Sequence, residues 1–127
     1  MKQFLLSLAA ILSSAMLASA ADSQNVTPDQ AEKLLKEKKD IVVLDVRTPE
    51  EFKSGHIAGA KNVDFQSEDF KKQVAALDKS KTYLVHCAAG GRSSRALEVL
   101  DKDKFSHVYH MNGGFSAWKE AGKPVAK

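Results

Sequence analysis

The chain has 127 residues, a length that predicts a single domain. Apolar residues make up 43% of the chain and charged residues 28%, and this composition excludes a disordered, collagen-like or coiled-coil protein. The net charge of +3, without a basic run, argues against nucleic-acid binding, and the single cysteine excludes an internal disulfide or a cysteine-based zinc site.

The amino-terminal residues predict an export signal. Met1 to Gln3 is a short positive segment, Phe4 to Leu17 is apolar apart from serines, and Ala18 to Ala20 has the small side chains at which a signal peptidase cleaves. The apolar stretch has fourteen residues, whereas a helix that crosses a bilayer needs about 20. We therefore expect removal of residues 1–20, with cleavage after Ala21 as the alternative. The mature protein is expected in the periplasm, without membrane attachment.

The mature chain, residues 21–127, is expected to form one domain in which helices and strands alternate. Thr27-Pro28 and Thr48-Pro49 each predict a helix start, because threonine caps free amides and proline suits the first turn. Residues 21–26 are interpreted as a polar lead-in. Helices are expected over residues 27–39, 48–54, 70–77, 93–100 and 115–121, and strands over residues 41–44, 62–63, 82–86 and 107–111. This alternation predicts an α/β fold, a parallel sheet with helices on both faces.

One junction between a strand and a helix contains the only cysteine. Cys87 follows the strand expected over residues 82–86, and after it come small residues, an arginine and a serine: Ala88, Ala89, Gly90, Gly91, Arg92 and Ser93. Such a backbone can curl and direct its N–H groups at the sulfur, and the helix start and the Arg92 guanidinium add positive potential. The arrangement favours the thiolate and predicts Cys87 as a nucleophile.

The energies indicate that the whole loop is needed. A cysteine with a pKa of about 8.5 is about 3% ionised at pH 7, and lowering that pKa by about two units takes about 2.7 kcal/mol. One helix terminus supplies about 0.3–1 kcal/mol, or about 2 kcal/mol when partly buried. Several N–H groups and Arg92 must therefore share the stabilisation. The alternative is a buried structural thiol, which is common, although a free thiol in an exported protein favours a functional role.

Three segments resemble the rhodanese family of sulfurtransferases, and the likeness spans almost all of the mature chain. They are Asp45-Val46-Arg47-Thr48-Pro49-Glu50-Glu51-Phe52 continuing into Gly55 to Val63, Cys87-Ala88-Ala89-Gly90-Gly91-Arg92-Ser93, and Gly113-Gly114-Phe115-Ser116-Ala117-Trp118. The second is similar to the Cys-x-x-Gly-x-Arg-Ser active-site loop of that family, and the third is similar to its Gly-Gly-x-x-x-Trp element. The resemblance implies a rhodanese-like parallel sheet of about five strands with helices on both faces.

The resemblance also implies sulfur transfer through a persulfide. The Cys87 thiolate would take the outer sulfur of thiosulfate and release sulfite, and cyanide or a thiol would then accept the sulfur. The expected partners are therefore a small-molecule sulfur donor and acceptor. The reaction requires no metal and no organic cofactor, and we expect a monomer.

Charged residues at the same sheet edge complete the expected site. Asp45 and Arg47 follow the first strong strand, and we assign Arg47 to the anionic donor, with a structural ion pair as the alternative. Arg92 is also assigned to substrate binding, with attachment to Glu51 as loop support as the alternative. The expected site comprises the nucleophile Cys87, the binding residues Ala88, Ala89, Gly90, Gly91, Arg92 and Arg47, and the supporting residues Asp45, Glu51 and Ser93.

Two other classes of function stay open. Phosphatases and arsenate reductases that share this fold have five residues between their cysteine and arginine, whereas four separate Cys87 from Arg92. The shorter loop favours transfer of one sulfur over a phosphoester, and hydrolysis of an aryl phosphate would distinguish the two. The other alternative is a non-catalytic rhodanese-like module that carries sulfur or binds a partner. Such modules often lack the cysteine.

The histidines are expected to be structural. His86 precedes the nucleophile, but neighbouring strand residues point to opposite faces, so His86 is interpreted as packed in the core. His56 is expected to anchor a turn. His107 and His110 are interpreted as lying on different strand faces and away from the cysteine, which argues against a metal site.

Overall fold

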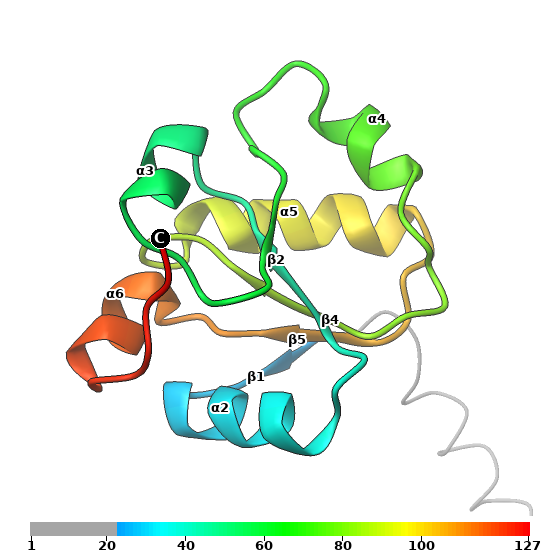
Figure 1. Ribbon diagram of the computed structural model, residues 1–127. Coiled ribbons are helices and arrows are strands. Elements are labelled where there is room, and N and C mark those ends of the chain that lie inside the picture. The colour runs from blue at the N-terminus through cyan, green and yellow to red at the C-terminus, as the bar shows by residue number, and fades with distance from the viewer. Residues whose placement is uncertain (1–22) are drawn as a thin grey trace, which may run out of the picture.

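The computed structural model describes residues 23–127, which form an α/β structure around one sheet (Figure 1). Five strands pair in parallel in the order β1-β5-β4-β2-β3. They are β1 (Gln24–Asn25), β2 (Val42–Asp45), β3 (Lys61–Asn62), β4 (Tyr83–His86) and β5 (Val108–His110). The expected parallel sheet is confirmed. The expected export signal lies outside the described residues.

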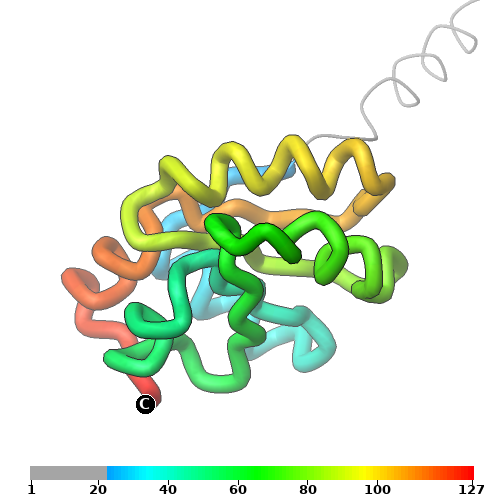
Figure 2. Tube along the Cα trace, turned by 90° about the horizontal axis from the view of Figure 1, so that it is seen from above, coloured from blue at the N-terminus to red at the C-terminus, as the bar shows by residue number. Residues whose placement is uncertain are grey.

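Helices cover both faces of the sheet, as expected. Figures 1 and 2 show α2 and α6 on one face and α4 and α5 on the other, and α3 lies where β2 ends. The helices are α2 (Pro28–Glu37), α3 (Pro49–Ser54), α4 (Phe70–Ala75), α5 (Gly91–Lys102) and α6 (Gly114–Glu120). Within residues 23–127, no helix is both long and apolar enough to cross a bilayer.

Alternation along the central strands divides the core into two halves. Leu44 and Val85 point toward α4 and α5, whereas Val43 and Leu84 point toward α2 and α6. All four side chains are buried. Because helices cover both faces, these strands have no polar side, which explains their continuous apolar runs in the sequence.

The register of the two central strands determines which loops meet. β2 and β4 are aligned from Val42 opposite Tyr83 to Asp45 opposite His86. Both strands therefore end at the same edge of the sheet, and the segments that leave them start side by side. In parallel α/β sheets this edge is where ligands bind.

Two helices begin with the capping box that the sequence predicts. In α2, the Thr27 hydroxyl accepts from the Gln30 amide at 3.1 Å, and the Gln30 side chain accepts from the Thr27 amide at 2.9 Å. Thr48 and Glu51 make the same exchange at the start of α3. These bonds satisfy amides that have no partner within the helix. Both predicted helix starts are confirmed.

The structure differs from the sequence prediction at β1 and at the start of α5, besides shifts of one or two residues at the ends of other elements. The interpretation of residues 21–26 as a lead-in is wrong for Gln24–Asn25, which form the edge strand β1 beside β5. Both side chains are exposed, so this strand leaves no apolar pattern in the sequence. Helix α5 begins at Gly91 rather than Ser93, and Gly90 at its cap position has a left-handed φ of 108°, which glycine adopts readily.

Strand β2 ends in a carboxylate that is removed from water. Asp45 has no exposed surface, and its oxygens accept hydrogen bonds of 2.7–3.2 Å from the backbone and guanidinium N–H groups of Arg47. Arg47 also donates to the Gly55 carbonyl at 2.8 Å, and its guanidinium lies 4.2 Å from the centre of the Phe115 ring. Loss of one partner of a buried ion pair costs about 3–5 kcal/mol. The pair therefore fixes the end of β2 to α3 and α6.

Candidate active site

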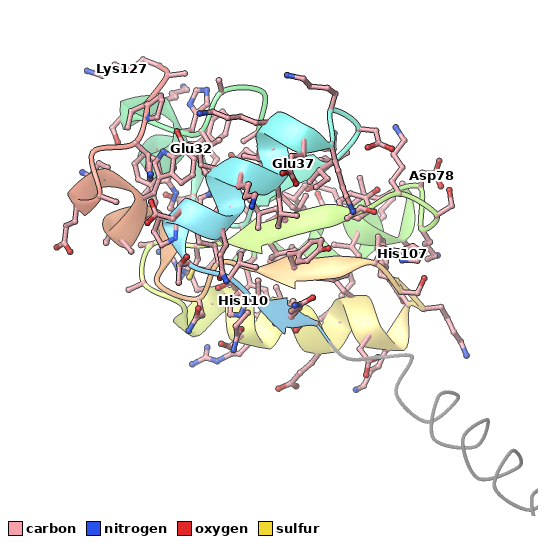
Figure 3. All side chains as sticks on the ribbon, turned by 90° about the horizontal axis from the view of Figure 1, so that it is seen from below. Glu32, Glu37, Asp78, His107, His110 and Lys127 are labelled. Carbon is pink, nitrogen blue, oxygen red and sulfur yellow. The ribbon has the colours of Figure 1, made fainter. Side chains whose placement is uncertain are left out.

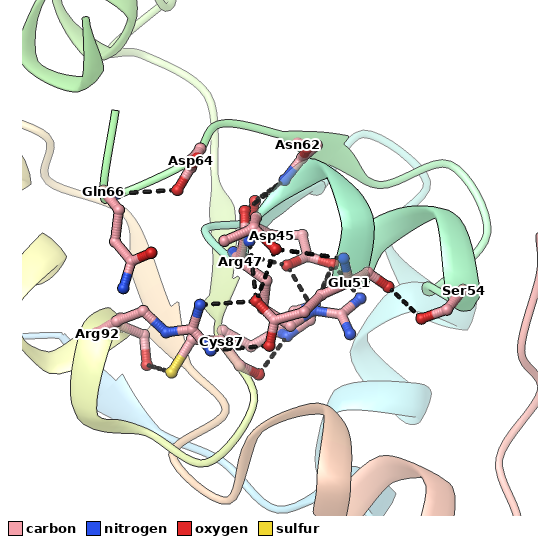
Figure 4. Close-up of polar contacts among 12 residues, drawn as sticks. Asp45, Arg47, Glu51, Ser54, Asn62, Asp64, Gln66, Cys87 and Arg92 are labelled. Carbon is pink, nitrogen blue, oxygen red and sulfur yellow. Dashed lines mark hydrogen bonds and ion pairs between the residues drawn. The ribbon is translucent and has the colours of Figure 1, made fainter. Parts of the chain in front are cut away.

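Cys87 lies at the carboxyl end of the central strand β4, beneath the loop that leads into α5 (Figure 4). Only 1% of its surface is exposed. Alternation turns Cys87 toward α5 and turns the adjacent His86 toward α6, where its ring stacks on Phe115 with the centroids 6.1 Å apart. His86 is therefore packed on the opposite face, as the sequence predicts.

Several hydrogen-bond donors converge on the sulfur of Cys87. The Gly90 amide lies 3.1 Å from Sγ and the Ser93 hydroxyl oxygen lies 3.3 Å from it. Burial raises the pKa of the Cys87 thiol, whereas the Ser93 hydroxyl and three backbone amides lower it. The three amides belong to Ser93, Gly90 and Ala89. The donors outweigh burial, so the pKa of Cys87 lies below its ordinary value and the thiolate is favoured.

The direction of these amides follows from contacts between the loop and α6. The Phe115 amide donates to the Cys87 carbonyl at 2.9 Å, and the Ser116 amide donates to the Ala88 carbonyl at 3.0 Å. Both amides belong to the first turn of α6, where N–H groups have no partner within the helix. In a planar trans peptide the C=O and N–H point in opposite directions. An Ala88 carbonyl that faces α6 therefore turns the Ala89 amide toward Sγ.

Two glycines permit this close contact between the loop and the start of α6. Gly90 has a φ of 108° and Gly114 a φ of 70°, both in the left-handed region. A Cβ on Gly90 would overlap the Asn112 carbonyl, and a Cβ on Gly114 would overlap the Ala88 carbonyl. Gly91 differs, because it is the first residue of α5 and a Cβ there would meet no neighbour.

Arg92 lies at the rim of the site and is bound to Glu51 (Figure 4). Its guanidinium donates to both carboxylate oxygens, at 2.7 and 3.0 Å. These hydrogen bonds lower the pKa of Glu51 to about 2. The hydrogen bonds that Arg92 donates to Glu51 raise the pKa of Arg92, and the charge of Cys87 acts in the same direction. The structure agrees with the alternative interpretation of Arg92 as a residue held by Glu51, and it places the guanidinium near the sulfur.

The structure corrects the expectation that Arg47 binds an anionic donor. Only 4% of Arg47 is exposed, and its guanidinium is held by Asp45 and by the Gly55 carbonyl. Its charge is therefore neutralised inside the protein, on the face of the sheet opposite to Cys87. Asp45 is the partner of Arg47 in this buried ion pair, and its supporting role at the site stays a prediction.

The structure also corrects the interpretation of His110 as distant from the cysteine. Nε2 of His110 lies 2.7 Å from the hydroxyl oxygen of Ser93, which in turn contacts Cys87. His110 pairs with Val85 across the sheet, and paired residues share a face, so His110 and Cys87 both face α5. His107 is exposed and lies near the other end of β5 (Figure 3). The sequence alone does not indicate that His110 lies close to Cys87, because this proximity follows from the register of β5 against β4.

His86 contributes to the frame beneath the loop. Its Nδ1 donates to the Cys87 carbonyl at 2.9 Å, and its Nε2 has no hydrogen-bond partner within residues 23–127. Burial lowers the pKa of His86 and favours the neutral ring, although Asp45 opposes this effect. Across the described part of the chain, no three histidine, cysteine or acidic side chains form a group that could hold a metal ion.

Residues 27–121 match the family model of the rhodanese-like domain. The mitochondrial protein HIGH ARSENIC CONTENT 1 of Arabidopsis thaliana is 43% identical over 89 residues, 62% of this chain and 53% of that protein, so the chain spans about half of its length. Thiosulfate sulfurtransferase GlpE of Pseudomonas putida is 37% identical over 100 residues, 78% of this chain and 87% of that protein. The crystal structure of a rhodanese-related protein from Thermoplasma volcanium superposes with a TM-score of 0.67 at 35% identity, covering 82% of this chain and 96% of that one.

The contact between the loop and α6 predicts that Gly114→Ala destabilises the protein and raises the pKa of Cys87. A left-handed φ costs a non-glycine residue about 1–3 kcal/mol, and the overlap with the Ala88 carbonyl adds to this loss. The measurements are urea unfolding and the thiolate absorbance of Cys87 as a function of pH.

Gly122→Ala is the matched control, because Gly122 has a φ of 75° and a Cβ there would meet no neighbour. This variant should lose only the stability due to backbone strain, and it should keep the pKa of Cys87. Equal effects of the two substitutions on stability and on the pKa would contradict the role of the loop contact.

Proposed function

This chain belongs to the family of rhodanese-like domains, and from that premise we propose that it transfers the outer sulfur of thiosulfate to an acceptor through Cys87. The Cys87 thiolate attacks the outer sulfur, the S–S bond of thiosulfate breaks, and sulfite leaves with the bonding electron pair. Cyanide or a thiolate then attacks the terminal sulfur of the Cys87 persulfide. The S–S bond of the persulfide breaks, and the Cys87 thiolate is restored.

The observation that carries this proposal is the convergence of donors on one sulfur. The amide of Gly90 and the hydroxyl of Ser93 contact Sγ, and together with the neighbouring loop amides they lower the pKa of Cys87. A thiolate is the attacking species, and it is also the leaving group in the second step. The same donors therefore favour both steps. Binding of the donor by Ala88, Ala89 and Gly91 stays a prediction.

The cysteine content is consistent with delivery of sulfur to an external acceptor. The sequence has one cysteine, so a persulfide on Cys87 meets no second thiol of the same chain that could take the sulfur and form a disulfide. The sulfur stays on Cys87 until a nucleophile enters the site. A small thiol or cyanide is the expected acceptor.

The competing phosphatase and arsenate reductase functions require a loop arginine that binds a tetrahedral oxyanion. In this structure the Arg92 guanidinium donates to both oxygens of Glu51, and four residues separate Arg92 from Cys87. Assays of aryl phosphate hydrolysis and arsenate reduction on the same preparation would separate these reactions from sulfur transfer.

The first prediction from this function concerns the intermediate. Incubation of the protein with thiosulfate should add one sulfur, about 32 Da, to Cys87, as intact-mass and peptide analysis can measure. Cyanide should remove this mass and yield thiocyanate. Cys87→Ser should show neither the mass gain nor turnover, and thiocyanate formation by the serine variant would refute the proposal.

A second prediction separates the two roles of Arg92. If Arg92 binds the donor anion, Arg92→Gln should raise the KM for thiosulfate about tenfold or more, because a hydrogen bond to a charged group contributes about 1.5–3 kcal/mol. Glu51→Gln should act in the opposite direction, because it releases the Arg92 guanidinium. Glutamine preserves the helix cap, as Gln30 does in α2.

The comparison of KM values between these two variants is the measurement, with thermal unfolding as the control for stability. A higher KM in Arg92→Gln and a lower KM in Glu51→Gln support direct binding of the donor. A higher KM in both variants would mean that the ion pair only supports the loop.

We also propose that the protein acts in the periplasm, on the basis of the export pattern in residues 1–20. Expression of the full chain in a bacterial host with two membranes should yield a periplasmic protein that begins at Ala21, or at Asp22 if cleavage follows Ala21. Intact-mass analysis of the periplasmic fraction measures this. Recovery of the uncleaved chain from the cytoplasm alone would contradict the proposal.

A further inference from the structure

The hydroxyl of Ser93 lies among three possible acceptors but has one proton. Its oxygen is 3.3 Å from Sγ of Cys87, 3.2 Å from the carbonyl oxygen of Gly90 and 2.7 Å from Nε2 of His110. A hydroxyl donates one hydrogen bond and accepts others. The neighbour that receives this proton decides whether Ser93 stabilises the thiolate.

The carbonyl of Gly90 is already satisfied. It accepts from the Ser94 amide at 3.0 Å and from the Ser94 hydroxyl at 2.8 Å. A carbonyl oxygen has two lone pairs, and both are used by these bonds. The Ser93 proton therefore goes either to Sγ of Cys87 or to Nε2 of His110.

The protonation of Nε2 selects between these two acceptors. A bare Nε2 accepts the Ser93 proton across the shorter distance, and the sulfur then loses that donor. An Nε2 that carries hydrogen donates to the Ser93 oxygen instead, and the Ser93 proton is left for Sγ. We propose that His110 is a positioning residue that carries hydrogen on Nε2 and thereby directs the Ser93 hydroxyl at the sulfur of Cys87. The inference deepens the sulfur transfer proposed above and rests on it for its role in turnover.

The surroundings of His110 suit this role. Only 3% of the residue is exposed, and its carbonyl accepts from the Val26 amide at 2.9 Å, which attaches it to the chain next to β1. Cys87 lies on the same face of the sheet as His110, and Ser93 of α5 contacts the ring. His86 lies on the opposite face of the neighbouring strand and affects His110 through its charge. Burial and the proximity of His86 lower the pKa of His110, so the ring is neutral near pH 7 and carries one hydrogen. The ring nitrogen that carries this hydrogen therefore decides whether the Ser93 hydroxyl donates to Sγ of Cys87 or to Nε2 of His110.

The test is a double-mutant cycle on the pKa of Cys87. The chain has one cysteine, so the thiolate absorbance reports Cys87 alone. Ser93→Ala should raise the pKa of Cys87 by about one unit, the effect of losing one hydrogen bond to a charged group. His110→Leu removes the competing Nε2 and leaves Sγ as the acceptor of the Ser93 proton, so it should keep the pKa of Cys87 close to the wild-type value. If His110 acts through Ser93, the double variant should show no larger shift than Ser93→Ala alone.

Two further variants serve as controls. His110→Gln keeps an N–H donor toward the Ser93 oxygen and should keep the wild-type pKa of Cys87. His107→Leu removes an exposed histidine next to the same strand and should leave that pKa unchanged. An unchanged pKa of Cys87 in Ser93→Ala, or a lowered pKa in His110→Leu, would overturn the proposal, because either result means that Nε2 of the wild-type protein takes the Ser93 proton.

A direct measurement on the wild-type protein makes the test independent of folding in the variants. NMR chemical shifts of the ring nitrogens identify the tautomer of His110. Hydrogen on Nε2 supports the proposal, and hydrogen on Nδ1 alone overturns it. None of these measurements uses a sulfur donor. Failure of thiosulfate turnover would therefore refute the proposed function, whereas failure of the cycle would refute only the role of His110.

Discussion

The peptide groups of residues 87–89 serve two parts of the structure at once. Their carbonyls accept from the first amides of α6, and the Ala89 amide on the far side of the same peptide plane faces the sulfur. The closing helix of the fold and the nucleophile therefore depend on the same backbone. This explains why glycine is needed on both sides of the contact, at Gly90 and Gly114, where a side chain would separate the two segments.

The two arginines nearest the sheet edge are each neutralised by a carboxylate. Asp45 binds Arg47 in the core, and Glu51 binds Arg92 at the rim. The stabilisation of the Cys87 thiolate consequently comes from neutral donors, namely backbone amides and one hydroxyl, at a buried site. Such donors are already oriented when the charge forms, so little reorganisation is needed during the reaction.

Local signals in the sequence were sufficient for much of the fold and for the position of Cys87 in a loop of small residues between a strand and a helix. The Thr-Pro pairs mark two helix starts, and the alternation of elements gives the parallel sheet. The edge strand β1 could not be predicted, because its two exposed side chains leave no pattern. The positions of Arg47 and His110 depend on strand register and on which face each side chain takes. Those properties arise from pairing between segments that are far apart in the chain. The local sequence pattern does not determine this pairing.

The use of main-chain groups to hold the sulfur has an evolutionary consequence. The Ala89 side chain is exposed, while its amide faces Cys87. Substitution at position 89 changes the surface that an incoming molecule meets, but it leaves the amide in place as long as the backbone path is kept. Selection can therefore vary the exposed surface at this position, while the amides that stabilise the Cys87 thiolate are inherited unchanged.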